Sequence, residues 1–228
     1  MALKRELEKP EKEQGRMQRM PKRGNPPTMT AHGHFERHTF ATGPMENNVY
    51  LLVSPQTREA VLIDASDEAE RIAKEVAALK ARVRMILLTH GHADHWGALG
   101  QLRDTWGVPV GIHLADAEML PLTPNFALDD GQRIGLGSSE IRVLHTPGHT
   151  PGGVCFLADG CLFSGDTLFP GGPGATKQPL GDFPLIMTSL REKLCTLPDS
   201  TVVLPGHGLP TTIGHERPSL DEWQARGW

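Results

Sequence analysis

Four side chains that can bind a metal ion lie within six consecutive positions of this chain: His90, His92, Asp94 and His95. Imidazole and carboxylate groups packed this closely repel or desolvate one another unless a cation lies among them. His90 and His92 are two positions apart and point to the same side of an extended backbone, and the other two follow where the chain must turn. The apolar run at 83–88 predicts a buried strand before them. Because open sheets bind their ligands at the carboxyl ends of strands, the pattern predicts a metal site.

Three further candidate ligands each follow an apolar run and lie beside a glycine, which lets backbone and metal approach closely. They are His149 after residues 141–144, Asp166 after 161–164 and His207 after 201–204. A lone His or Asp is most often structural, but recurrence at three successive predicted strand ends favours metal binding. All seven candidates are nitrogen or oxygen ligands. That set is too large for one tetrahedral zinc ion and suits two ions that share a carboxylate.

These residues stand in motifs by which the chain closely resembles the metallo-β-lactamase-fold hydrolases. The motifs are His90-x-His92-x-Asp94-His95, Pro147-Gly148-His149-Thr150-Pro151-Gly152, Gly165-Asp166-Thr167-Leu168-Phe169 and Pro205-Gly206-His207, within a resemblance that runs from about Phe35 to about Gly214. The resemblance implies one metal ion held by His90, His92 and His149, a second held by Asp94, His95 and His207, and Asp166 as the bridge. True β-lactamases of this fold commonly carry Cys where Asp166 stands and lack the paired Asp94-His95. The pattern is therefore similar to that of the glyoxalase-II-like branch.

Strands and helices alternate along both halves of the chain, which predicts an α/β fold. The expected strands are 49–53, 60–63, 83–88, 108–112, a run of short strands over 133–164, and 201–204; the expected helices are one capped by Asp67 with Glu70, one at 96–105 and one at 185–197. The family resemblance implies that these elements form the four-layer αβ/βα sandwich. A two-residue turn at Asp159-Gly160 would pair Ala158 with Cys161 and place Cys155 on the opposite face, where no disulfide can join the two cysteines.

Two adjacent cations define the expected chemistry. A solvent molecule between them loses a proton far more easily than bulk water, with a pKa that falls from about 15.7 towards about 7. The bridging hydroxide would attack a small thioester or ester, and Asp94 would orient it and pass its proton to the leaving atom. Lys177 lies in the glycine-rich loop after Asp166, where it could meet a substrate carboxylate. We expect two Zn²⁺ ions, with Fe²⁺ or a mixed Fe/Zn pair as alternatives.

Two other activities of this fold stay open. Persulfide dioxygenases resemble the chain in the His-rich motif and use one iron, but they typically have Arg-Thr-Asp where this chain has Ala175-Thr176-Lys177. Lactonases of the fold often place a tyrosine near the metals, whereas the only tyrosine here, Tyr50, lies in an early predicted strand. The chain offers no Gly-x-Ser-x-Gly motif for a serine nucleophile.

Charge divides the chain into two predicted parts. Residues 1–29 contain eight basic and four acidic residues, so with a whole-chain charge of −4 the remainder, 30–228, carries −8. We expect 1–29 to be a disordered basic tail and 30–228 to be the hydrolase domain. The acidic domain opposes nucleic-acid binding, and no apolar run approaches the roughly 18 residues that would span a membrane. A small-molecule substrate and a cytoplasmic location are expected, and the oligomeric state is left open.

The remaining polar candidates are expected to have structural roles. Asp64, His113 and His145 lie near predicted strand ends and could pack beside the ligands or orient them. Trp96 should pack where a helix begins, and Cys195 should be a small core residue. The other histidines lie in polar terminal stretches and are expected on the surface: His32, His34, His38 and His215.

Overall fold

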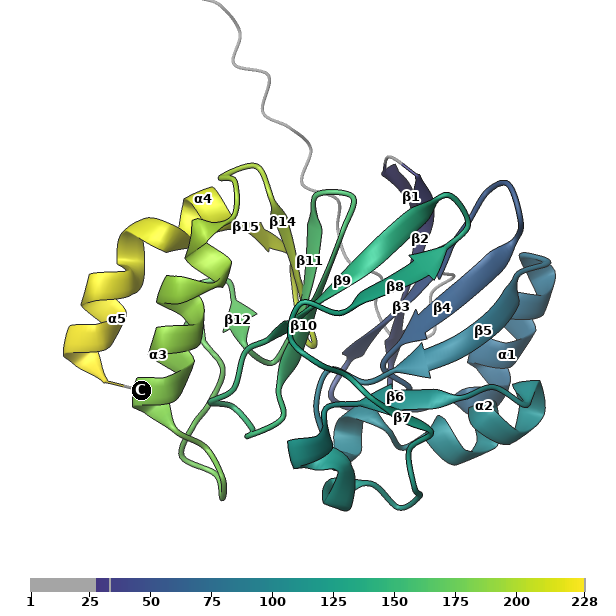
Figure 1. Ribbon diagram of the computed structural model, residues 1–228, viewed down its shortest axis with the longest axis horizontal. Helices are drawn as coiled ribbons and strands as arrows, with labels where there is room; N and C mark the ends of the chain where they lie inside the picture. Colours follow the sequence, from purple (N-terminus) through teal and green to yellow (C-terminus); the bar gives the residue numbers. More distant parts are fainter. Residues whose placement is uncertain (1–27, 33, 228) are drawn as a thin grey trace, which may run out of the picture.

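Two large β-sheets stacked face to face form the centre of this computed structural model, which describes residues 28–32 and 34–227 (Figure 1). The first sheet has the order β1 (Thr28–His32), β2 (Phe35–Thr42), β3 (Asn47–Val53), β4 (Glu59–Ile63), β5 (Arg82–Leu87), β6 (Val110–Ile112) and β7 (Phe126–Ala127). The second has the order β15 (Thr211–Thr212), β14 (Val202–Pro205), β11 (Cys161–Gly165), β10 (Val154–Ala158), β9 (Ser139–His145) and β8 (Arg133–Leu136). A small hairpin of β12 (Leu168–Phe169) and β13 (Gly172–Pro173) lies beside the second sheet.

Helices cover the outer face of each sheet. The first sheet carries α1 (Ala69–Ala78) and α2 (Leu99–Trp106), and the second carries α3 (Phe183–Glu192), α4 (Ile213–Glu216) and α5 (Leu220–Arg226) (Figure 1). Short 3-10 helices are Ala93–His95, Leu114–Met119, Leu194–Thr196 and Arg217–Ser219. The order helix, sheet, sheet, helix is the four-layer αβ/βα sandwich, as predicted.

Three apolar clusters hold the layers together, and strand alternation sorts the side chains among them. In β3, Val49 and Leu51 face α1 and α2, while Tyr50 and Leu52 face the second sheet. In the second sheet, Phe156 and Phe163 join the cluster between the sheets, whereas Leu162 and Ile186 of α3 belong to the outer one. Each sheet is therefore buried on both faces, which explains the nearly continuous apolar runs of its strands.

The β10–β11 hairpin has the predicted two-residue turn. Ala158 pairs with Cys161, and both turn residues, Asp159 and Gly160, have positive φ angles of 47° and 72°, as a tight hairpin turn requires. Cys155 lies in the outer cluster and Cys161 between the sheets, so the two thiols point to opposite faces, and both are free. Cys195 is buried in the outer cluster, as expected.

The predicted helix cap at Asp67 is wrong. Glu68, with a φ angle of 58°, occupies the position before α1, and no side chain caps the helix. The Asp67 carboxylate instead accepts a hydrogen bond from the Glu68 amide at 2.7 Å. The left-handed residue turns the chain before the helix begins, which directs the Asp67 side chain away from the helix amides.

The predicted helix at 96–105 begins three residues late. Ala93–His95 forms a 3-10 turn, and α2 starts only at Leu99. The intervening backbone is held by the loop after β4, since the Ala98 amide donates to the Ala65 carbonyl at 2.8 Å. A Cβ on Gly97 would lie 2.5 Å from the Ser66 carbonyl oxygen, so this approach requires glycine. The helix predicted at 185–197 is likewise divided into α3 and a 3-10 helix.

The surface prediction for His38 is wrong. The side chain is 4% exposed and lies on the same face of β2 as Phe40, towards α1. Burial lowers its pKa, because the neutral ring is easier to desolvate than the charged one. His34 and His215 are exposed, as expected, whereas the His32 side chain lies outside the described residues.

The expected tail, 1–29, falls almost entirely outside the described residues, which begin at Thr28. Thr28 and Met29 pair with Thr39 and His38 as the start of β1, so the folded part begins two residues before the expected boundary at residue 30.

Candidate metal centre

The seven candidate ligands meet at one end of the sandwich, where strands of both sheets end. His90, His92, Asp94 and His95 follow β5 of the first sheet. His149, Asp166 and His207 follow β9, β11 and β14 of the second sheet. The cluster therefore spans the seam between the two sheets, and neither sheet supplies it alone.

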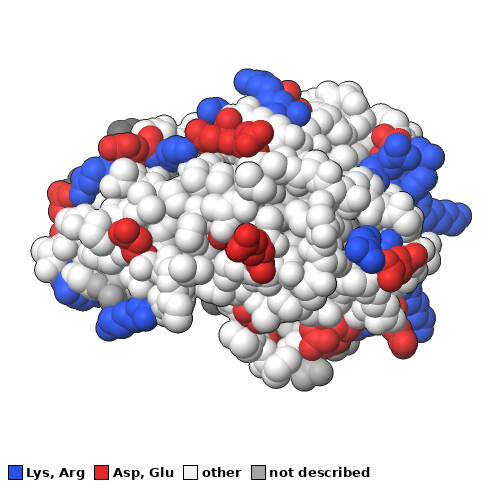
Figure 2. Space-filling model, turned by 60° about the horizontal axis from the view of Figure 1, so that its bottom comes forward, with Lys and Arg blue, Asp and Glu red and all other residues white. Residues whose placement is uncertain are grey.

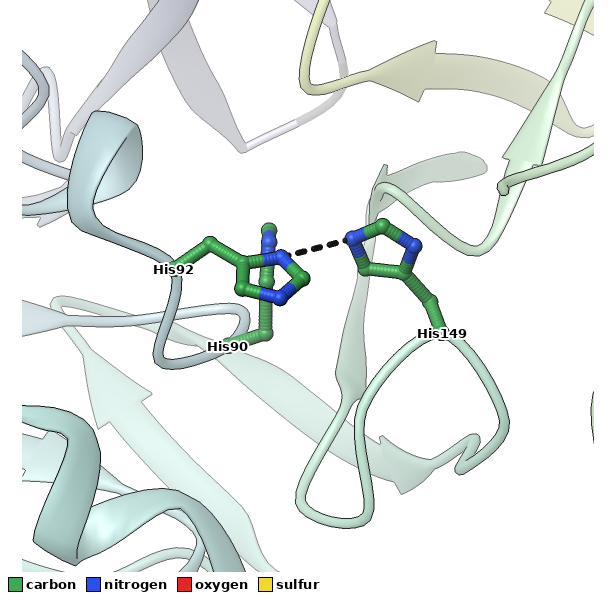
Figure 3. Close-up of side chains that lie close together, drawn as sticks. All are labelled: His90, His92 and His149. Carbon is green, nitrogen blue, oxygen red and sulfur yellow. Dashed lines mark hydrogen bonds between the residues drawn. The ribbon is translucent and has the colours of Figure 1, made fainter. Parts of the chain in front are cut away.

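The first group of candidate ligands is His90, His92 and His149, whose ring nitrogens lie within 4.8 Å of one another. His92 Nδ1 and His149 Nε2 are 2.9 Å apart, and these two nitrogens point toward each other from separate loops beside His90 (Figure 3). All three are imidazoles, a ligand type that suits zinc, copper and iron.

The second group is Asp94, His95 and His207, whose ligand atoms also lie within 4.8 Å of one another. Asp94 Oδ2 is 3.2 Å from His207 Nε2 and 3.5 Å from His95 Nε2. An isolated β-bridge between Asn47 and His207 joins the second sheet to the start of β3 and fixes the position of the last ligand.

Asp166 lies between the two groups. Its Oδ2 is 3.6 Å from His149 Nε2 of the first group and 3.6 Å from His207 Nε2 of the second. Its Oδ1 is 3.5 Å from His95 Nε2. One carboxylate thus approaches imidazoles of both groups, which is the arrangement that a bridging ligand needs.

Unsatisfied polar atoms in the cluster fit a metal site. His90 Nε2, His95 Nε2 and Asp166 Oδ1 are buried and have no hydrogen-bond partner, and these three residues form a further group with ligand atoms within 4.8 Å. Buried polar atoms without a partner are costly, and three that converge on one point are explained by a cation among them. The donor set, imidazole nitrogen and carboxylate oxygen, is the one that zinc and iron bind.

Hydrogen bonds at the outer ring nitrogens orient three of the imidazoles toward the cluster. The Nδ1–H of His95 donates to Asp64 Oδ2 at 2.9 Å, and the Nδ1–H of His149 donates to the Ala175 carbonyl at 2.7 Å. His207 Nδ1 contacts the Met45 carbonyl oxygen at 3.2 Å. In each case the nitrogen facing away from the cluster has an acceptor, so Nε2 is left as the ligand atom.

Asp64 supports two ligands at once. Besides His95, its carboxylate accepts from the Thr89 hydroxyl at 2.9 Å, and that hydroxyl lies 3.0 Å from His90 Nδ1. Asp64 is 1% exposed, so this network is screened from water. The sequence placed Asp64 near a strand end with either a structural or an orienting role, and the structure gives it the second.

Burial and charge set the protonation of the metal-free cluster. Burial lowers the pKa of His90 well below its ordinary value, and the neighbouring imidazoles lower it further. Burial also opposes protonation of His95, but the carboxylates of Asp166 and Asp64 outweigh it and raise its pKa well above the ordinary value. Burial alone would raise the pKa of Asp94, but hydrogen bonds from His207 and Asn47 and the charge of His95 hold it well below the usual range.

Two residues of this region were not found from the sequence. Asn47 Nδ2 donates to Asp94 Oδ2 at 2.9 Å, and Asn48 Nδ2 donates to the carbonyls of Pro205 and Gly208, both at 3.0 Å. The adjacent pair of asparagines after a glycine-containing turn was the available signal, because buried amides at a strand start need partners.

Other predicted residues lie around the cluster without joining it. His113 and His145 stack on each other with ring centroids 3.9 Å apart, which bears out a packing role. Trp96 donates its indole N–H to the Gly91 carbonyl at 2.8 Å and so braces the loop between His90 and His92. Lys177 is exposed on the loop whose Ala175 carbonyl supports His149. Tyr50 is buried and donates its hydroxyl to the Pro205 carbonyl at 2.7 Å.

The chain belongs to the metallo-beta-lactamase superfamily, whose family model matches residues 42–207. A curated relative, the hydroxyacylglutathione hydrolase GloC of Haemophilus influenzae, is 36% identical over 188 residues, which cover 74% of this chain and 89% of that protein.

Two solved structures share the architecture and bear on the metal. ETHE1 from Myxococcus xanthus matches with a TM-score of 0.74 and 32% identity over 79% of this chain and 81% of that one. TTHA1623, solved in a di-iron-bound form, matches with a TM-score of 0.68 and 35% identity over 78% of this chain and 96% of that one. Similarity at this level shows the fold and is consistent with a metal site.

Basic and acidic side chains are interspersed on the face shown in Figure 2, where red and blue residues lie next to one another and white residues separate them. That face of the described chain presents no continuous basic surface of the kind that binds a polyanion. Among the described helices, none combines the length and the apolar character needed to cross a membrane.

Proposed function

We propose that this chain is a dinuclear metal-dependent hydrolase that acts on a small thioester or ester. The observation that carries the proposal is the position of the Asp166 carboxylate, 3.6 Å from an imidazole of each group. The similarity to the GloC hydrolase supports a thioester such as a 2-hydroxyacyl glutathione. Thioesters suit this chemistry because a thiolate leaves readily.

In this proposal the first group holds one Zn²⁺ ion, the second group holds another, and Asp166 bridges them. Fe²⁺ or a mixed Fe/Zn pair is the alternative, supported by the di-iron-bound neighbour. When bound, such ions supply a Lewis acid for a carbonyl oxygen and a water with a pKa near 7. The buried ring nitrogens of His90 and His95, which lack other partners, are the atoms best placed to serve as ligands.

Asp94 is the proposed catalytic carboxylate. The amide of Asn47 donates to its Oδ2 and fixes its orientation at the cluster. A carboxylate held at this position can accept the proton of an attacking water. From there the proton would pass to the leaving sulfur or oxygen, which departs as a neutral thiol or alcohol.

Lys177 is the proposed substrate contact. Its loop is tied to the cluster through the Ala175 carbonyl, and its exposed ammonium group can meet a substrate carboxylate there. Ala175, Thr176 and Lys177 line a surface pocket together with Arg226 and Gly227 at the end of α5. A carboxylate group on the substrate would find a cation in this pocket.

The proposal is tested by elemental analysis of the purified full chain and an assay of thiol release from 2-hydroxyacyl glutathione. We expect about two transition-metal ions per chain and thiol release that does not depend on oxygen. One ion per chain in fully loaded protein would overturn the dinuclear assignment.

A second candidate is a mononuclear iron persulfide dioxygenase. The similarity to ETHE1 supports it. His149 lies beside both His90 and Asp166, and these three residues are two imidazoles and one carboxylate of the type that holds such an iron. Measurement with an oxygen electrode and glutathione persulfide discriminates the two activities. Oxygen uptake by iron-loaded protein, with no thioester cleavage by the zinc form, would replace the hydrolase assignment with the dioxygenase assignment. A lactonase is less well supported, because the hydroxyl of Tyr50 is bonded to a backbone carbonyl.

A further inference from the structure

One buried carboxylate outside the candidate ligands contacts both loops that carry the first group. Asp116 lies in the 3-10 helix Leu114–Met119 after β6, and its side chain is fully buried, with 0% exposed. Its Oδ2 accepts from the Gly91 amide at 2.9 Å, and Gly91 lies between His90 and His92.

The same carboxylate reaches the loop that carries His149. Its Oδ2 also accepts from the Thr150 hydroxyl at 2.6 Å, and its Oδ1 accepts from the Gly152 amide at 2.6 Å. The first loop belongs to the first sheet and the second to the second sheet, so Asp116 bridges the seam. All three donors are uncharged groups, and hydrogen bonds from such groups to a carboxylate are among the strong ones.

The two loops also pack closely against the 3-10 helix that carries Asp116. A Cβ on Gly152 would lie 2.6 Å from Asp116 Cγ. A Cβ on Gly91 would lie 2.7 Å from Met119 Cβ and 3.1 Å from the Asp116 carbonyl oxygen. Both loops can approach the 3-10 helix only because they carry glycine there, so the helix fixes where each loop lies.

We propose that Asp116 is a positioning residue that fixes the separation between the His90–His92 loop and the His149 loop, and thereby sets the metal affinity of the first group. The inference rests on the proposed metal centre. His92 Nδ1 and His149 Nε2, 2.9 Å apart, come from different sheets, and Asp116 is the side chain that bonds to both loops. It acts through Gly91, Thr150 and Gly152, which lie in the same loops as the candidate ligands.

The test is the zinc affinity of the metal-free full chain, measured by competition with a chromophoric chelator. In Asp116→Asn the side-chain amide keeps the volume but turns an NH₂ group towards at least one of the three donors, which pushes the loops apart. We expect the zinc ion whose binding is lost in His149→Ala to bind about 10–100-fold more weakly, and the affinity for the other ion to change little. Thr150→Val removes only one donor and should lower the affinity for the same ion by a smaller factor. It serves as the test if Asp116→Asn does not fold.

Glu216→Gln is the matched control. Glu216 is a second buried carboxylate that joins two segments, since it accepts from the Gly171 amide at 2.9 Å and the Thr211 hydroxyl at 2.5 Å, but it touches no loop of the first group. It should lower thermal stability and leave zinc affinity unchanged. Equal zinc affinity in wild type and Asp116→Asn, or equal weakening in both carboxylate variants, would overturn the positioning role. A wild-type chain that binds no zinc in this titration would instead overturn the proposed zinc centre on which the inference rests.

Discussion

The two groups of candidate ligands are held in place by different means. The first group consists of imidazoles alone, and its geometry depends on two loops joined through backbone amides to Asp116. The second group contains its own carboxylate, Asp94, and its central imidazole, His95, is paired with Asp64. The first group is thus organised by the position of the backbone and the second by charged side chains.

Because of this difference, we expect the metal affinities of the two sites to respond to different perturbations. Charge-assisted side-chain contacts make the second group sensitive to the removal of a carboxylate or to protonation. The first group carries no acidic ligand of its own, so its affinity depends on how closely its three rings are preorganised. Only Asp166 belongs to both.

The largest effect is expected for Asp166→Ala. Removing the carboxylate between the groups should lower the metal affinity of both sites or empty them. Loss of a residue that only hydrogen-bonds to a metal ligand typically lowers activity up to roughly 100-fold, and the fall here should be larger. Zinc content by elemental analysis and thioester turnover check this. Full zinc content in this variant would mean that the groups are independent.

A smaller and one-sided effect is expected for His95→Ala. It should remove the ion of the second group and leave about one zinc per chain, because the first group keeps all its rings. His149→Ala is the matched change on the other side and should leave the second ion bound. If either variant lost both ions, the separation of the two groups would be contradicted.

Proton release should also differ between the groups. The pKa of His92 is lowered by burial and by His149, so this ring is already neutral at pH 7. The pKa of His95 is raised by its carboxylates, so it still carries a proton at pH 7 that zinc must displace. Burial lowers the pKa of His207, but its hydrogen bond to Asp94 and a second nearby carboxylate outweigh burial and raise it above the ordinary value. Filling the second group should therefore release more protons than filling the first, and its affinity should rise more steeply as the pH increases. Calorimetry in buffers of different ionisation enthalpy measures the number, and equal release would contradict the difference.

The smallest effect is expected for deletion of residues 1–27. All candidate ligands lie at or after position 90, so both groups should keep their ions and kcat/KM should be unchanged. Assay of the shortened chain beside the full one tests this. A large loss of kcat/KM at full metal content would show that the deleted segment contributes to the active site.

The sequence predicted the parts of this cluster that depend on local spacing. His90, His92, Asp94 and His95 could be found because they are close in the chain, and His149, Asp166 and His207 because each follows an apolar strand run. Strand alternation likewise predicted that Cys155 and Cys161 occupy opposite faces of the sheet.

The supporting residues could not be predicted because their partners are distant in the chain. Asp116 accepts from residues 25 to 36 positions away, and Asn47 donates to Asp94 from 47 positions away. The paired asparagines mark buried amides that need partners, but no local pattern identifies those partners, since the contacts exist only once the sheets are stacked. The late start of α2 has the same origin, because the loop after β4 holds the backbone at residue 98.

The bridge between Asn47 and His207 also has a consequence for the order of events during synthesis. The first residue lies at the start of β3 and the second 160 positions later, after β14. A ribosome releases the chain from its amino end, so Asp94 and His95 emerge more than a hundred residues before the imidazole that completes their group. The HxHxDH motif is thus synthesised early, but the second group cannot be assembled until residue 207 has been translated. On the proposed function, filling of the second group is therefore a late step in the maturation of this chain.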